Sequence, residues 1–204
     1  MTKIRGWTQH GQLFSVIPEP PPKYYTLLIP LPSSTNLYKG LEQQMKIISN
    51  SLKIISIDQI KNPFLEDAYK TIKKIISKQC SASNPNERLL FHGTSLLGII
   101  GITEDGFDDR FFNAGGAWGY GSYFADNPRK SHGFTALDVT DQTRVMFYSK
   151  VLLGKESIQN TTNNALVSAP QGHPSVRGTA FQYAEYIVYR YGQALPYLKI
   201  VYKD

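Results

Sequence analysis

The sequence predicts an α+β fold, and three observations support this class. Two helical patterns lie in the N-terminal half, at 37–48 and 63–79, whereas short strand-forming runs with glycine- and proline-bearing connections follow Arg88. Strands without regularly alternating helices favour α+β over a doubly wound sheet. We expect a loosely ordered tail at 1–22, which ends in PEPPP, and one domain over 23–204.

Local signals justify each element of the N-terminal half. Tyr24–Leu31 and the isoleucine-rich segment 52–57 are typical of strands. Between them, residues 37–48 carry apolar side chains at a helical spacing. For the second helix, Asn62 can cap the first turn and Pro63 suits the first helical position. Its apolar stripe consists of Leu65, Ala68, Tyr69, Ile72, Ile75 and Ile76.

The remainder of the chain predicts strands and little helix. The turn residues of 81–87 indicate a loop, and one helix is expected around Ser95–Thr103. Strands are expected at Leu89–His92, Ser122–Ala125, Arg144–Leu153, Glu185–Arg190 and Leu198–Lys203.

Composition excludes several classes of protein. The only cysteine, Cys80, permits neither an internal disulfide nor a four-cysteine zinc site. No apolar run approaches the roughly 20 residues of a membrane span, and no secretory signal is evident. We therefore expect a cytoplasmic, nuclear or host-delivered protein without a membrane partner. The net charge of +6 favours acidic ligands, but the lysines of 63–79 are more typical of a solvated helix face than of a nucleic-acid patch.

Two polar residues stand at unusual places in predicted strands. His92 ends the run LLFH beside Gly93, where a ring nitrogen and bare backbone can both face a ligand, although most such histidines are structural. Glu185 shares a strand face with Ile187 and Tyr189. Either this strand is an edge with its carboxylate in water, or the carboxylate is held for chemistry.

The segment GGAWGYGSYFAD at 115–126 is a third unusual feature. It lacks the Lys-Ser/Thr of a phosphate loop, and it precedes a strand, unlike a dinucleotide fingerprint. A mobile surface loop is one interpretation. The other rests on Tyr123, Ser131 and Phe134, because two rings with a hydroxyl between them can clamp a flat, amide-bearing heterocycle.

These motifs resemble the catalytic domain of the poly(ADP-ribose) polymerase family, the diphtheria-toxin-like ADP-ribosyltransferases of the His-Tyr-Glu type. The resemblance rests on LLFHGT, GSYFAD and AEYIVY, and it runs from about Tyr24 to the C-terminus. Within the family, the flanking sequences are most similar to those of tankyrases. The resemblance implies two packed, mostly antiparallel sheets around an NAD cleft.

The resemblance also implies roles for individual residues. His92, Tyr123 and Glu185 would be catalytic. The NAD-binding set would be His92, Gly93, Thr94, Tyr123, Phe124, Ala125, Ser131 and Phe134. Phe134 stands where the family usually has a second stacking tyrosine. A flap over the cleft would contain Phe107, Asp108, Phe111, Phe112 and Trp118, with ordinary packing as the alternative for the phenylalanines.

The implied activity consumes NAD, releases nicotinamide and transfers ADP-ribose to protein side chains, those of the protein itself included. A glutamate at 185 is compatible with poly(ADP-ribose) elongation. The alternatives are mono-ADP-ribosyl transfer, transfer to nucleic acid, and a non-catalytic module that binds NAD or ADP-ribose. We expect no metal, because the stretch after Ser131 lacks the cysteines of the tankyrase zinc loop, and no DNA-damage regulatory domain, because 1–22 is too short.

Overall fold

The computed structural model describes residues 4–7, 13–16, 26–112 and 115–204, the first two ranges by their backbone alone. Strands β1 (Ile4–Trp7) and β2 (Leu13–Val16) pair antiparallel. Other residues of 1–25 lie outside the described residues, so the predicted tail at 1–22 and the domain boundary stay predictions.

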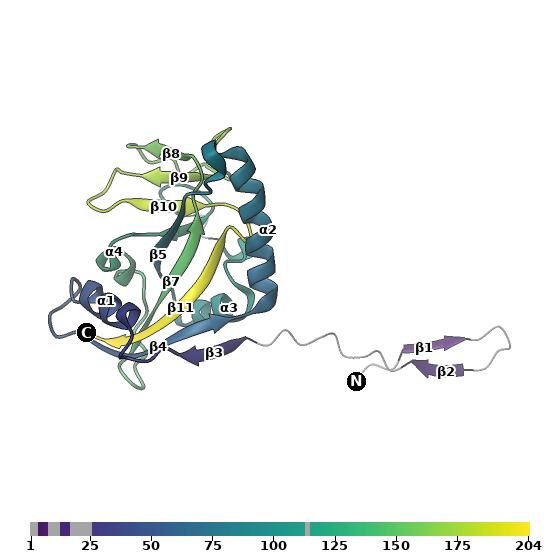
Figure 1. The fold of residues 1–204 in the computed structure, drawn as a ribbon, viewed down its shortest axis with the longest axis horizontal. Helices are drawn as coiled ribbons and strands as arrows, with labels where there is room; N and C mark the ends of the chain where they lie inside the picture. Colours follow the sequence, from purple (N-terminus) through teal and green to yellow (C-terminus); the bar gives the residue numbers. More distant parts are fainter. Residues whose placement is uncertain (1–3, 8–12, 17–25, 113–114) are drawn as a thin grey trace.

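Two sheets form the body of the molecule (Figure 1). The five-stranded sheet is antiparallel throughout, with the order β3 (Leu27–Pro30), β4 (Lys53–Lys61), β11 (Ala194–Lys203), β7 (Arg144–Leu152) and β5 (Glu87–Gly93). The four-stranded sheet has the order β6 (Ser122–Phe124), β10 (Glu185–Val188), β9 (Ser175–Gly178) and β8 (Glu156–Gln159), and only its β8–β9 pair is parallel. The predicted α+β fold with two mostly antiparallel sheets is confirmed.

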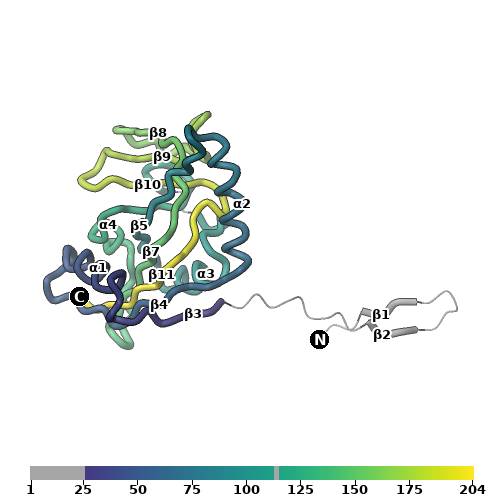
Figure 2. The backbone as a smooth tube through the Cα atoms, in the orientation of Figure 1, coloured from purple at the N-terminus to yellow at the C-terminus, as the bar shows by residue number. Residues whose placement is uncertain are grey.

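The sheets meet where β5 passes the end of β6. Phe91 and Ala125 exchange two backbone hydrogen bonds of 2.8 and 2.9 Å, which link the two sheets directly. Figure 2 traces the backbone, in which β5 and β7 lie side by side although they are far apart in the sequence. A buried cluster packs beside the junction and includes Leu90, Phe107, Phe124, Phe147, Tyr186 and Val188. Ends of strands from both sheets are thereby held close to one another.

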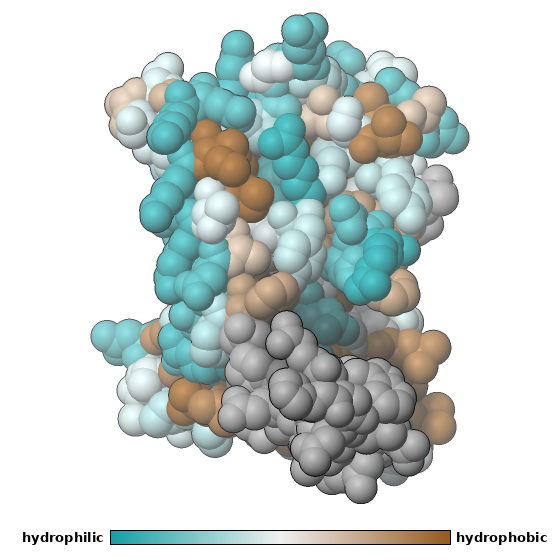
Figure 3. Space-filling model, turned by 90° about the vertical axis from the view of Figure 1, so that its right-hand side faces the viewer, coloured by the Kyte–Doolittle hydropathy of each residue, from teal (hydrophilic) through white to brown (hydrophobic). Residues whose placement is uncertain are grey.

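The helices are α1 (Asn36–Met45), α2 (Pro63–Gln79), α3 (Leu96–Asp105) and α4 (Pro128–His132), with two 3₁₀ turns, η1 (Ser81–Ser83) and η2 (Asp109–Phe111). Helix α2 has the predicted bounds, and the Asn62 side chain accepts hydrogen bonds from the backbone N–H groups of Phe64 and Leu65. Figure 3 views the side of the molecule that carries α2. Lys70, Lys74 and Lys78 of this helix are exposed. This agrees with a solvated helix face.

Several predicted elements need correction. Helix α1 ends at Met45, three residues early, and β4 continues to Lys61. The expectation of a single helix after Arg88 is wrong, because α4 forms as well. Helix α4 has five residues and no apolar stripe, so a periodicity search does not find it. Strands β8 and β9 were not predicted either, because ESIQ and SVRG have four residues each and a single large apolar side chain. None of the helices in the described residues is long and apolar enough to cross a membrane.

Candidate active site

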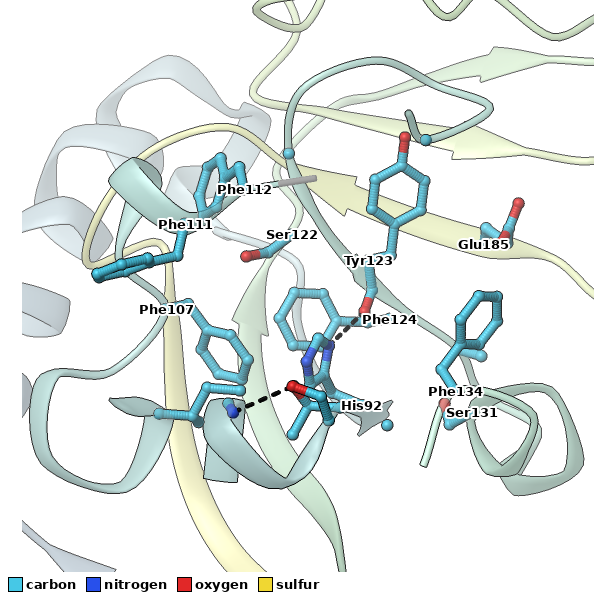
Figure 4. Close-up of a pocket in the computed structure, with 18 of the residues that line it drawn as sticks. His92, Phe107, Phe111, Phe112, Ser122, Tyr123, Phe124, Ser131, Phe134 and Glu185 are labelled. Atoms are coloured by element: carbon cyan, nitrogen blue, oxygen red, sulfur yellow. Dashed lines mark hydrogen bonds between the residues drawn. The ribbon is translucent and has the colours of Figure 1, made fainter. Parts of the chain in front are cut away.

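One cleft of about 840 Å³ is lined by residues of both sheets, of α3 and α4, and of the segment after α3. A volume of this size lies in the range of ligand sites. Figure 4 shows Tyr123, Phe134 and Glu185 on one side of His92, and Phe107, Phe111 and Phe112 on the other. The predicted residues that line the cleft are His92, Gly93, Thr94, Phe107, Asp108, Phe111, Phe112, Tyr123, Phe124, Ala125, Ser131, Phe134 and Glu185. The structure therefore brings together every predicted site residue except Trp118.

His92, near the end of β5, is held in one tautomer. Its Nδ1 lies 2.7 Å from the Tyr123 carbonyl oxygen, and a carbonyl can only accept, so Nδ1 carries the proton and Nε2 is left as an acceptor. Burial lowers the pKa of His92 to about 4, against the opposing effect of this hydrogen bond. The rings of Phe107 and Phe124 pack against the imidazole at centroid distances of 5.0 and 5.4 Å. A neutral, oriented imidazole in a cleft suits hydrogen bonding to a ligand hydroxyl.

Tyr123 of β6 is fixed at its hydroxyl group. The hydroxyl donates to the Gly119 carbonyl at 2.7 Å and accepts from the Trp118 backbone N–H at 2.9 Å. Burial raises the pKa of Tyr123 to about 12, so the hydroxyl stays protonated near neutral pH. With its hydroxyl held inside the protein, the Tyr123 ring forms a wall of the cleft that can stack on a flat ligand.

The glycine-rich segment is shaped by contacts within the protein. Gly119 has a φ of +80°, and a Cβ there would overlap the Leu166 carbonyl. The Tyr120 N–H donates to this same carbonyl at 2.7 Å, and the Asn163 N–H donates to the Ala117 carbonyl at 2.9 Å. The glycine at 119 therefore makes room for another loop of the protein.

Glu185 begins β10, an interior strand between β6 and β9. The residue is only 5% exposed, so the alternative of an edge strand with a solvated carboxylate is wrong. Its Oε2 accepts a hydrogen bond of 2.8 Å from Trp118 Nε1, and its Oε1 lies 3.0 Å from Lys130 Nζ. A buried carboxylate with two donors, on the lining of a cleft, can stabilise positive charge that develops on a ligand.

Helix α4 contributes Ser131, which is buried, and leads to Phe134, which is 60% exposed. The Lys130 ammonium lies 5.4 Å from the Phe134 ring centroid and 5.1 Å from that of Phe181. Lys130 and Phe181 line the cleft beside Glu185, and neither was predicted from the sequence. A single lysine before Ser131 and a phenylalanine in a loop carry no periodic signal. Their closeness to Ser131 and Glu185 in the sequence was the only clue.

The predicted flap divides into residues that pack and a residue that is exposed. Phe107 and Phe112 are buried although they line the cleft, whereas Phe111 is 78% exposed. The pKa of Asp108 is lowered by its hydrogen bonds with the Arg110 guanidinium. The prediction for Trp118 needs correction, because this residue has no exposed surface and does not line the cleft. It packs with Val176, Ile187 and Tyr189, behind the lining residue Tyr123.

The described residues contain no group of three or more His, Cys, Asp or Glu side chains that could hold a metal ion. His132, which follows Ser131, uses both ring nitrogens within the protein. Its Nδ1 lies 2.8 Å from the Tyr202 hydroxyl oxygen, and its Nε2 lies 3.3 Å from the Asp204 carboxylate.

A histidine, a tyrosine and a glutamate from three strands thus line one cleft, which is the arrangement that the resemblance to the ADP-ribosyltransferase catalytic domains implied. The family model for the poly(ADP-ribose) polymerase catalytic domain matches residues 35–181, and the chain belongs to this family. The matched range ends before Glu185. The position of that carboxylate in the cleft is therefore an independent structural observation.

Curated relatives include human protein mono-ADP-ribosyltransferase PARP12, which is 36% identical over 100 residues that make up 48% of this chain and 14% of the relative. Mouse protein mono-ADP-ribosyltransferase PARP3 is 30% identical over 151 residues, 72% of this chain and 26% of the relative. Human protein mono-ADP-ribosyltransferase PARP14 is 28% identical over 147 residues, 71% of this chain and 8% of the relative. The chain thus spans about a quarter or less of the length of these proteins.

Proposed function

We propose that this protein consumes NAD⁺, releases nicotinamide and transfers ADP-ribose to protein side chains. The observation that carries the proposal is the buried Glu185 carboxylate, which lines the same cleft as His92 and Tyr123. A module that only binds NAD or ADP-ribose does not need a buried carboxylate next to the reacting sugar. Membership of the polymerase catalytic domain family supports the same conclusion.

The reaction requires little acid catalysis. Nicotinamide leaves as a neutral base, and the ribose passes through an oxocarbenium-like transition state, as in glycoside hydrolysis. Glu185 would accept a hydrogen bond from the ribose 2′-hydroxyl, offset the developing positive charge and polarise the incoming nucleophile. Since the carboxylate is already oriented by two donors, little rearrangement would be needed in the transition state.

The remaining cleft residues would bind the dinucleotide. Gly93, through its backbone, and Ser131, through its hydroxyl, would hold the nicotinamide carboxamide, and the rings of Tyr123 and Phe134 would pack on the nicotinamide ring. His92, through the acceptor nitrogen Nε2, would bind a hydroxyl of the adenosine ribose, with Thr94 close by. The exposed Phe111, on the far side of His92, would cover the adenine.

Two product patterns are proposed from different observations. The relatives are named mono-ADP-ribosyltransferases, which supports transfer of a single ADP-ribose unit. Glu185 supports competence for elongation, since it can also polarise the hydroxyl of an already attached ADP-ribose. The likeness to tankyrases stays a prediction. We further propose that residues 23–204 act as one catalytic domain, in the cytoplasm or nucleus of the producing or host cell.

To test the proposal, the purified chain is incubated with NAD⁺ that carries a label in its adenylate part. Separate reactions contain the chain alone, the chain with a cell extract, and the chain with nucleic acid. Nicotinamide release and labelled products are followed for the wild type, for Glu185→Gln and for Glu104→Gln. Glu104 is an exposed glutamate outside the cleft lining, so its variant should match the wild type. Glu185→Gln should release nicotinamide at least about 100-fold more slowly than the wild type.

The form of the product then distinguishes the alternatives. A discrete labelled protein band indicates single transfer, a smear indicates elongation, and salt-sensitive labelling of added DNA or RNA indicates a nucleic-acid acceptor. Absence of both nicotinamide release and labelled product, from a folded protein, would contradict the proposed activity and favour the binding module.

A further inference from the structure

We propose that Trp118 is a positioning residue, whose indole N–H orients the Glu185 carboxylate for the reaction. The inference rests on the proposed function, and it gives a task to a residue that lies outside the cleft lining. Trp118 Nε1 donates to Glu185 Oε2 at 2.8 Å, and both residues are buried. An indole nitrogen can only donate and a carboxylate can only accept, so Trp118 is the donor in this bond.

The indole itself is held firmly in place. Trp118 packs with Val176, Ile187 and Tyr189 and has no exposed surface. Its carbonyl accepts a hydrogen bond of 2.7 Å from the Tyr189 hydroxyl, and its backbone N–H donates to the Tyr123 hydroxyl at 2.9 Å. Trp118 therefore contacts both Tyr123 in the wall of the cleft and the Glu185 carboxylate, and its own position is fixed by packing.

The neighbouring strand leaves room for this arrangement. Gly178 of β9 is the register partner of Glu185 in β10, and a Cβ at Gly178 would overlap the indole ring of Trp118. A glycine at this position lets the large ring lie against the strand next to the carboxylate. Any side chain there would displace the N–H from Glu185.

The two donors to Glu185 differ in character. Lys130 supplies a charge on a flexible side chain from α4, and its ammonium also contacts the exposed rings of Phe134 and Phe181. Trp118 supplies a neutral donor from a closely packed core, and it orients the carboxylate without neutralising it. Preorganised groups of this kind stabilise developing charge without rearranging at the moment of reaction. Loss of the N–H should leave the carboxylate free to turn toward Lys130.

The decisive variant is Trp118→Phe, which keeps an aromatic ring but removes the N–H donor. Loss of one hydrogen bond to a charged group should lower the kcat for nicotinamide release by about 10- to 100-fold. The KM for NAD⁺ should stay within about threefold, because the cleft walls are unchanged. The matched control is Tyr69→Phe, which also removes a buried aromatic donor to a carboxylate, the 2.9 Å bond to Glu87, but at two residues that do not line the cleft. Its kcat should equal that of the wild type.

A double-mutant cycle separates positioning from general loss of structure. If Trp118 acts through the carboxylate, adding Trp118→Phe to Glu185→Gln should change the residual kcat by less than about twofold. Full additivity of the two effects, or a Trp118→Phe enzyme with the kcat of the wild type, would overturn the inference while the proposed function stood.

A spectroscopic readout tests the contact independently of catalysis. The chain has two tryptophans, Trp7 and Trp118, so a ¹⁵N-labelled sample should show two indole N–H signals. The Trp118 signal should move upfield and exchange faster with solvent in Glu185→Ala, while the Trp7 signal stays in place. An unchanged Trp118 signal would disprove the pairing even in a protein that had no transferase activity or in which Trp118→Phe did not fold.

Discussion

Acidification should destabilise the fold through His92, and the size of the effect follows from its burial. The pKa of His92 is lowered from 6.5 to about 4 because desolvation disfavours the imidazolium. Between these two values the unfolded chain binds more protons at this residue than the folded protein, so the free energy of unfolding decreases as the pH falls. One pKa unit corresponds to about 1.4 kcal/mol, so the full window corresponds to at most about 3.5 kcal/mol.

The assay compares urea unfolding of the wild type and of His92→Asn from about pH 7.5 to about pH 4.5. Asparagine does not titrate, and its amide can still donate to the Tyr123 carbonyl. His132, whose pKa burial also lowers, is present in both proteins, and its contribution cancels in the difference. The stability advantage of the wild type should shrink by about 2–3 kcal/mol on acidification. A difference that does not vary with pH would refute the conclusion that the fold holds His92 neutral.

Three substitutions in the cleft have separable effects. Lys130→Met removes the charged partner of Glu185 and should lower the free energy of unfolding, measured by urea titration. The decrease should be smaller than the cost of breaking a fully buried ion pair, which is about 3–5 kcal/mol. Tyr123→Phe keeps the ring but removes two hydrogen bonds, so stability should fall by about 1–2 kcal/mol with a nearly unchanged KM for NAD⁺. Phe111→Ala, at an exposed position, should leave the melting temperature unchanged but raise the KM for NAD⁺, and an unaltered KM would remove Phe111 from the adenine site.

Secondary structure was predictable wherever the signals were local. Helix α2 has its cap at Asn62, its proline at the first position and its apolar stripe within a few turns, and its bounds were predicted correctly. Helix α4 also has a cap, at Asn127, and a proline at its first position, but its five residues are too few to form an apolar stripe. Strands β8 and β9 have no local signal of this kind. They form because the rest of the fold supplies their partners, as when β9 pairs with both β8 and β10.

The candidate site was predictable in its members but not in its geometry. The motifs around His92, Tyr123 and Glu185 named the residues through resemblance, and all three line one cleft. The residues alone did not decide whether Glu185 lies in water or in the interior. The burial of Glu185 depends on β6, which lies about 60 residues earlier in the chain and pairs with one edge of β10.

The sequence by itself determined the α+β class, the bounds of α2 and the residues that merited attention. Tertiary structure alone decided that Trp118 belongs to the core instead of a flap, and that Lys130 and Trp118 both contact Glu185. The physical reason is that caps and periodic stripes act within a few residues of chain. A buried carboxylate, in contrast, takes its donors from wherever packing places them, here from positions 55 and 67 residues away.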